Sequence, residues 1–207
     1  MVVGAVIKWF ASPNSNPTGL AWDGKTLWHS DSNTDRIYQL NPITGAVIKW
    51  FASPSTYPTD LAWDGKTLWH CDRTLDRIYQ LNPITVAVIK WFAALDIDPS
   101  GLAWDGKTLW HCDMTLDRIY QLNPITGATI RSFASPNIVP RGLAWDGQTL
   151  WHSDSNTDRI YQLNPITGAT IRSFVSPDTD PWGLAWDGKT LWVSTDNLNR
   201  IYQLETH

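Results

Sequence analysis

The feature that most constrains the fold of this chain is a repeat of 41 residues. The Trp-Asp pair begins at residues 22, 63, 104, 145 and 186, and five periods of 41 account for 205 of the 207 residues. A period of about 20 to 50 residues is typical of solenoids, propellers and linear arrays, in which each unit completes its core against its neighbours. The content of one unit therefore decides which of these architectures forms.

One repeat unit predicts four short β-strands and no helix. The expected strands cover residues 18–22, 26–31, 35–40 and, continuing the frame, 46–51. They are rich in Trp, Tyr, Ile and Val, and turn residues separate them at hairpin spacing. Four antiparallel strands in about 40 residues are typical of one propeller blade.

Two turns recur along the chain, the Asp-Gly turn in all five repeats and the Asn-Pro-Ile-Thr turn in four of them. Asp23-Gly24 predicts a tight hairpin in which both central residues have positive φ. Residues 41–45, Asn-Pro-Ile-Thr-Gly, predict a longer loop in which Gly45 takes positive φ. Val86 replaces this glycine in one copy, where a branched side chain at positive φ costs about 1–2 kcal/mol, so we expect Val86→Gly to stabilise the protein.

The two ends of the chain complement each other. Residues 4–10 form a lone fourth strand, and the chain stops after a third strand at residues 200–204. An open stack would leave both edges bare, whereas a ring in which the first strand completes the last blade leaves none. We therefore predict that residues 1–207 form one all-β domain, a five-bladed β-propeller with four antiparallel strands per blade.

The sequences PTGLAWDGKTLWHSD (residues 17–31) and DRIYQLNPITG (residues 35–45) resemble the repeat of NHL and YVTN propellers. The resemblance covers essentially the whole chain and implies a propeller fold. It implies no single function, because that superfamily includes protein and RNA binders, lactonases and five-bladed glutaminyl cyclotransferases. NHL propellers usually have six blades, so the expected count departs from them. Blades this alike indicate either recent duplication or design.

Composition narrows the classes of partner. The formal net charge is −4, without a run of basic residues, so we expect no binding to nucleic acid. No apolar run approaches the roughly 18 residues of a membrane span, and the first ten residues lack the features of a signal peptide. We expect a soluble monomer without a cofactor, and the sequence assigns no compartment.

The five copies differ mainly in two segments. One precedes the first strand of each unit, and the other links its second and third strands. Alternating strand directions place both segments on one face of the ring, where loops on a rigid scaffold commonly bind ligands; drift at exposed positions is the alternative. The ligand-binding residues expected on this face are Thr18, Tyr57, Thr59, Asp60, Arg73, Ser100, Met114, Arg141 and Trp182.

Repeated histidines and cysteines are interpreted as structural. His29, His70, His111 and His152 share one slot, which Val193 fills in the last copy. If these strands lie about 12 Å from the axis, equivalent residues of adjacent blades are about 14 Å apart, too far to share a metal ion. We expect buried imidazoles bonded to neighbours such as Ser30 or Asp31. The same spacing predicts that Cys71 and Cys112 are free thiols.

A fivefold arginine is also interpreted as structural. Arg36, Arg77, Arg118, Arg159 and Arg200 occupy equivalent positions. We expect each of them to pair with a carboxylate such as Asp31, although a repeated anion site on the surface would suit a multivalent lectin.

Catalysis requires unlike groups to converge, and near-symmetry works against it. The asymmetric residues near the axis are Asp60, Arg141 and Trp182, without a nucleophile triad, a phosphate loop or a metal-spaced cluster. The sequence therefore favours a non-enzymatic binding or scaffold protein, whose ligand is a protein or a carbohydrate. The alternatives are a lectin that stacks sugars on Trp or Tyr faces, and a hydrolase or glutaminyl cyclotransferase in the axial funnel.

Overall fold

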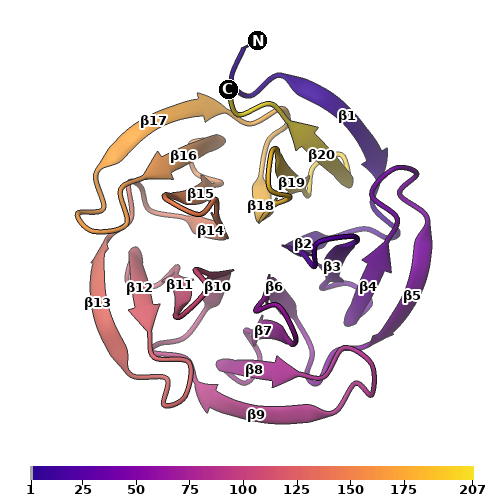
Figure 1. Ribbon diagram of the computed structural model, residues 1–207, viewed down its shortest axis with the longest axis vertical. Coiled ribbons are helices and arrows are strands. Elements are labelled where there is room, and N and C mark those ends of the chain that lie inside the picture. Colours follow the sequence, from indigo (N-terminus) through magenta and orange to yellow (C-terminus); the bar gives the residue numbers. More distant parts are fainter. Residues whose placement is uncertain (1) are drawn as a thin grey trace.

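Five four-stranded antiparallel sheets surround a central axis like the blades of a wheel (Figure 1). The computed structural model describes residues 2–207 and contains twenty strands in this range, β1 to β20. This arrangement confirms the predicted five-bladed β-propeller. No helix in the described residues is long and apolar enough to cross a membrane.

Each blade has an inner strand beside the axis, two middle strands and an outer strand. The inner strands are β2 (Pro17–Trp22), β6 (Pro58–Trp63), β10 (Pro99–Trp104), β14 (Pro140–Trp145) and β18 (Pro181–Trp186). The second strands are β3 (Leu27–Asp31), β7 (Leu68–Asp72), β11 (Leu109–Asp113), β15 (Leu150–Asp154) and β19 (Leu191–Thr195). The third strands are β4 (Arg36–Leu40), β8 (Arg77–Leu81), β12 (Arg118–Leu122), β16 (Arg159–Leu163) and β20 (Arg200–Leu204). The outer strands are β1 (Val6–Ala11), β5 (Val47–Ala52), β9 (Val88–Ala93), β13 (Thr129–Ala134) and β17 (Thr170–Val175).

The ring closes through the two ends of the chain. Strand β1 pairs antiparallel with β20, so the last sheet has the order β1-β20-β19-β18. In this pairing Trp9 lies opposite Tyr202, the same register that places Trp50 opposite Tyr38 within a continuous blade. The predicted closure of the last blade by the first strand is therefore confirmed.

The core lies between the blades rather than within them. Trp28 and Phe51 of one blade pack against Leu61 and Tyr79 of the next, and equivalent clusters fill the other four interfaces. The indoles of the second strands are fully buried there. Because each sheet is covered on both sides, its strands carry apolar residues on both faces, which explains why the sequence lacks strict alternation.

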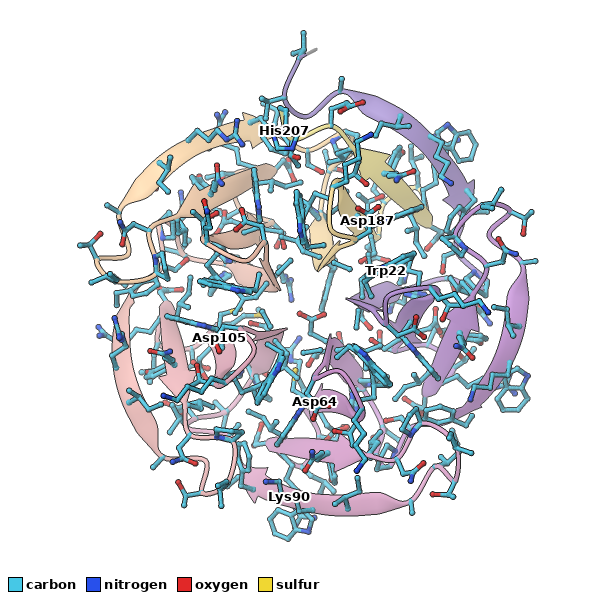
Figure 2. All side chains as sticks on the ribbon, viewed as in Figure 1. Trp22, Asp64, Lys90, Asp105, Asp187 and His207 are labelled. Carbon is cyan, nitrogen blue, oxygen red and sulfur yellow. The ribbon has the colours of Figure 1, made fainter. Side chains whose placement is uncertain are left out.

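The Asp-Gly turn differs from the predicted two-residue hairpin. Only Gly24 has positive φ (94°), whereas Asp23 does not. The Asp23 carboxylate accepts hydrogen bonds from the amides of Lys25 and Thr26, at 2.9 and 2.6 Å, and from the indole N–H of Trp28 at 2.9 Å. These bonds stabilise a four-residue loop, so the next strand begins one residue later than predicted. Equivalent aspartates, among them Asp64, Asp105 and Asp187, surround the axis in Figure 2.

The longer Asn-Pro loop matches its prediction. The Asn41 carbonyl accepts the amide of Gly45, and Gly45 has φ 74°. Val86 takes the same conformation, with φ 63°, and packs against the cluster that contains Phe51.

The four histidines are buried and most of their ring nitrogens are bonded, as predicted, but their partners differ from the expected ones. His29 bonds through Nε2 to Ser12 Oγ at 3.0 Å and through Nδ1 to the Gly19 carbonyl at 3.1 Å. Its ring stacks on Tyr38. Ser30 points to the other side of the strand, where its hydroxyl accepts the Gly19 amide, and Asp31 accepts the amide of Thr34 in the following loop. Burial lowers the pKa of each histidine to about 4, so the imidazoles are neutral near pH 7.

The repeated arginines do not pair with Asp31 or its equivalents, which corrects the prediction. Arg36, Arg77 and Arg200 stack at 3.7–3.8 Å on the outer-strand tryptophans Trp50, Trp91 and Trp9. Arg118 and Arg159 bond to serines at the same outer-strand position, Ser132 and Ser173. Within residues 2–207 the only ion pair joins Arg73 to Asp98. Asp31 Oδ1 accepts the amide and the hydroxyl of Thr34 in its own loop, whereas Asp31 Oδ2 is buried without a hydrogen-bond partner in the part of the chain that the structure describes. The Arg36 side chain turns to the tryptophan face instead.

Candidate functional site at the loop face

The ring has two unlike faces. The uniform Asp-Gly and Asn-Pro turns lie on one side, which we call the turn face. The segments that join successive blades and those that join second to third strands lie on the other, which we call the loop face. The sequence differences between blades therefore gather on the loop face.

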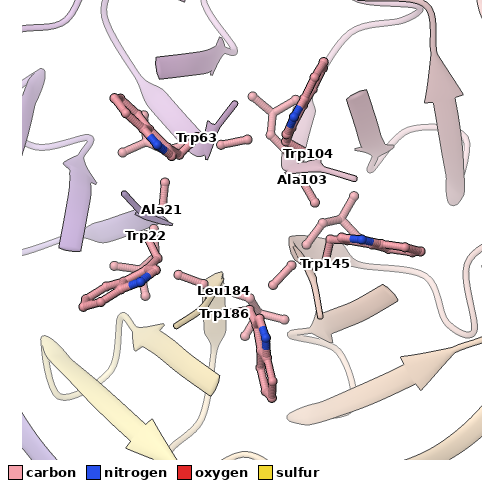
Figure 3. Close-up of a pocket in the computed structure, with 15 residues that line it drawn as sticks. Ala21, Trp22, Trp63, Ala103, Trp104, Trp145, Leu184 and Trp186 are labelled. Carbon is pink, nitrogen blue, oxygen red and sulfur yellow. The ribbon is translucent and has the colours of Figure 1, made fainter. Parts of the chain in front are cut away.

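An axial channel opens between the inner strands. Its volume is about 100 Å³, and it is lined by the Leu-Ala-Trp segment of each inner strand. Figure 3 shows Trp22, Trp63, Trp104, Trp145 and Trp186 around it, with their indole rings directed away from the axis. The channel is therefore lined largely by main chain and small side chains, and has room for a few water molecules.

Asp60 ties the inner strands together beside this channel. Its carboxylate is fully buried, and it accepts the amide of Leu20 at 3.1 Å and that of Leu102 at 2.8 Å, each from a different blade. Burial raises the pKa of Asp60 well above its usual range, although these amide bonds oppose the shift. Both carboxylate oxygens are thus engaged within the protein.

The slot that precedes Asp60 holds two kinds of residue. Thr18, Thr59 and Ser100 are buried, and their hydroxyls donate to the proline carbonyl of the next inner strand at 2.8–2.9 Å. They join neighbouring blades. Arg141 and Trp182 fill the same slot in the remaining two blades and contact each other instead.

Arg141 is largely covered yet carries an unmatched charge. Its guanidinium stacks at 3.8 Å on the Trp182 ring, while Nε donates to Ser155 Oγ and Nη1 to the Met114 sulfur, both at 3.0 Å. Burial lowers the pKa of Arg141, and the nearby Asp180 raises it without forming an ion pair. Trp182 is 7% exposed, and its buried indole N–H has no hydrogen-bond partner among the described residues.

A second group lies beside Arg141. Arg73 pairs with Asp98 at 2.7 Å and stacks at 5.0 Å on Tyr57, and these residues with Thr74 line a cavity of about 270 Å³. The Met114 amide donates to the Asp98 carbonyl, which links this group to Arg141. Tyr57 has φ 61°, a conformation that three other blades give to Asn16, Asp98 and Asp180. A bulky residue in this region is strained, which is typical of functional positions.

We call Tyr57, Arg73, Met114, Arg141 and Trp182 the mouth cluster. These five of the nine sequence-predicted site residues lie together, whereas Thr18, Thr59, Ser100 and Asp60 hold the inner strands. Sequence reasoning did not single out Asp98 or Ser155, although both lie in segments that differ between the copies. Only the contact with an arginine from another part of the chain reveals their role.

The two cysteines are free and buried near the axis. Cys71 contacts the Thr59 hydroxyl at 3.0 Å, and Cys112 donates to the Arg141 carbonyl at 2.9 Å. Burial raises the pKa of both thiols, so they are poor nucleophiles. Within residues 2–207 no three His, Cys, Asp or Glu side chains are placed to hold a metal ion.

Comparison with known proteins places the chain by its fold. No protein-family profile and no curated protein matches the sequence. Among solved structures, the glutaminyl cyclase of Myxococcus xanthus is similar with a TM-score of 0.83 and 13% identity, covering 97% of this chain and 95% of that chain. A nidogen/laminin complex gives 0.68 and 23%, covering 92% and 76%. Virginiamycin B lyase from Staphylococcus aureus gives 0.58 and 20%, covering 95% and 68%.

These identities are too low to transfer an activity, and the similar structures include two proteins named as enzymes and a complex of nidogen with laminin. The repeat, the closed ring and these similarities together bear out the expected resemblance to NHL-like propellers at the level of the fold. The chain is a five-bladed β-propeller built from tandemly repeated blades.

Proposed function

We propose that this propeller is a non-enzymatic binding protein that holds its ligand at the mouth cluster. The propeller fold supports a binding or scaffold role in general. The observation that carries the specific proposal is Arg141, a largely covered cation with no carboxylate within ion-pair distance. A protein that covers a charge without pairing it loses stability, and a ligand that supplies the missing partner recovers it.

The state of Asp60 supports binding over catalysis. A general base must reach the proton that it removes, whereas Asp60 is buried and both of its oxygens accept main-chain amides. No other described carboxylate is bonded to it or to the mouth-cluster arginine Arg141. The mouth cluster thus offers donors and apolar surface rather than an acid-base pair.

The test is a binding screen of small acids, amines, sugars and short peptides by isothermal titration calorimetry. Two variants use residues that other blades carry at the same positions. Arg141→Thr changes the loop face and should abolish binding of any true ligand, whereas Lys107→Gln changes the turn face, as in the blade that carries Gln148, and should leave it intact. A ligand retained by Arg141→Thr and lost by Lys107→Gln would place the binding face on the opposite side.

Exposed tryptophans favour a carbohydrate as a second candidate ligand. Trp9, Trp50 and Trp91 are each 50% exposed on the outer strands of three blades, with an arginine stacked on one ring face. Sugars stack on such faces, and three equivalent sites predict a stoichiometry of three per chain. The variant Trp50→Ser, which copies Ser132, should reduce that number to two; an unchanged number argues against sugar binding at the rim.

A further inference from the structure

The free donors of the mouth cluster identify the chemistry of a ligand, given the proposed function. A guanidinium has five N–H groups, and Arg141 uses one for Ser155 and one for Met114. Three remain, together with the unpartnered indole N–H of Trp182, whose ring lies against the guanidinium. Neighbouring donors without an acceptor match a group that only accepts, such as a carboxylate or a phosphate.

The charged side chains around Arg141 favour a ligand with one negative charge over a ligand with two. Asp98 already neutralises Arg73, so the cluster has a single unmatched positive charge, on Arg141. Asp180 and Asp196 lie near Arg141 outside ion-pair distance, and their charges influence each other. These carboxylates repel every anion, and they repel a dianion about twice as strongly as a monoanion. A ligand with a single negative charge therefore fits the surroundings of Arg141 better than a dianion.

The remaining surface of the cluster fits a flat apolar body. The cavity beside Tyr57 and Arg73 is open to solvent and has a volume of about 270 Å³. It therefore has room for a benzene ring, for which about 150 Å³ is enough in an enclosed apolar cavity. Tyr57 lines this cavity and offers an aromatic face. Asp98 also lines it, and its carbonyl accepts the amide of Met114, whose thioether contacts Arg141. The Arg73 guanidinium lies against the Tyr57 ring on one side.

From these three observations we propose that the mouth cluster binds a small aromatic monocarboxylate. The carboxylate accepts hydrogen bonds from Arg141 and from the Trp182 indole, and the ring occupies the cavity beside Tyr57.

Phenylacetate and its neutral analogue phenylacetamide test this proposal on the unmodified protein. Calorimetry should give one phenylacetate per chain, with a Kd of about 1 mM or tighter, and binding of the amide should be at least about tenfold weaker. Arg141→Thr should weaken phenylacetate binding by about tenfold or more. Trp182→Phe, which keeps a ring and removes the N–H, should weaken it about fivefold. Arg131→Thr, on the exposed side of β13, removes the same charge and should have no effect.

Equal affinity for the acid and the amide overturns the proposal, and this comparison does not depend on any variant folding. Inorganic phosphate that binds more tightly than phenylacetate, in a manner dependent on Arg141, also overturns it. If phenylacetate fails while another screened ligand depends on Arg141, the ligand class is wrong and the proposed function stands. If no screened compound binds, both are wrong. Near-ultraviolet circular dichroism checks that each variant is folded.

Discussion

The third blade has a defect that a single substitution should repair. In three blades a serine, Ser12, Ser53 or Ser135, bonds to the buried histidine Nε2 at 3.0–3.1 Å. Ala94 occupies that place beside His111, and the His111 Nε2 is left without a partner. The Ala94 amide already donates to Asp76 just as the Ser53 amide donates to Asp35. The backbone is therefore in position, and only the hydroxyl is missing.

We expect Ala94→Ser to raise the free energy of unfolding by about 1 kcal/mol. A buried polar group without a partner costs about 1–3 kcal/mol, and part of the gain is offset by burying the new hydroxyl. For a protein of this size the melting temperature should rise by about 2–4 °C. Urea unfolding, with the slope of the transition held equal between variants, measures the change.

Two variants decide whether the hydrogen bond is responsible. Ser53→Ala creates the same defect at His70 and should cost about 1–2 kcal/mol. Ala93→Ser makes the same chemical change at the adjacent exposed position and should be neutral within about 0.5 kcal/mol. If Ala94→Ser stabilises no more than Ala93→Ser, or if Ser53→Ala costs nothing, the buried Ser–His bond contributes no net stability.

Three further outcomes follow from individual residues. Burial lowers the pKa of His29 to about 4 in the folded protein, so below pH 6.5 the histidine takes up a proton when the protein unfolds. The free energy of unfolding should therefore fall by about 3 kcal/mol between pH 6.5 and pH 4, relative to that of His29→Val. Urea unfolding at each pH measures the difference. Tyr57→Asn, which places asparagine at φ 61° as at Asn16, should stabilise the fold by about 1 kcal/mol and weaken phenylacetate binding; a loss of stability would mean that the tyrosine is unstrained. Val86→Gly should raise both the melting temperature and the free energy of unfolding, the latter by no more than about 1 kcal/mol. The substitution relieves strain at φ 63°, but it also removes packing near Phe51 and adds the freedom of glycine to the unfolded chain.

The sequence was sufficient for the architecture because five copies of one unit repeat the same information. Strand positions agree to within one or two residues, and closure by β1 follows from matching an unfinished first unit to an unfinished last one. A repeat also restricts where strands can pair, since every sheet must satisfy the same register. A single unit of this sequence would not have specified the ring.

Side-chain partners were less predictable because they come from neighbouring blades and loops. His29 was expected to bond within its own strand, yet its partner Ser12 lies 17 residues earlier. Arg36 lies opposite Asp31 in register but stacks on Trp50, because a strand pairing fixes Cα positions and not the direction of a long side chain. Propensity and periodicity carry no information about this choice.

The candidate site was predicted in part by comparing the five copies with one another. Arg141 and Trp182 stand out because their slot holds Thr or Ser elsewhere. The same comparison also selected Thr59 and Ser100, which differ little between blades and hold inner strands together. Variation between copies identifies positions free to differ, whereas burial and bonding distinguish those that face a ligand from those that join blades.

The pairing of β1 with β20 has a consequence for how the chain can be rearranged. The seam uses the same register as every other third-to-outer strand pair, so the polypeptide could start in any of the five outer strands and retain the same contacts. A circular permutant with its ends moved to β9 or β13 should fold to the same wheel. A linker or second protein fused to the new chain end would then leave the ring at a different blade. Its position around the ring relative to the mouth cluster could thus be chosen in steps of one fifth of a turn, without a change to any residue of the mouth cluster.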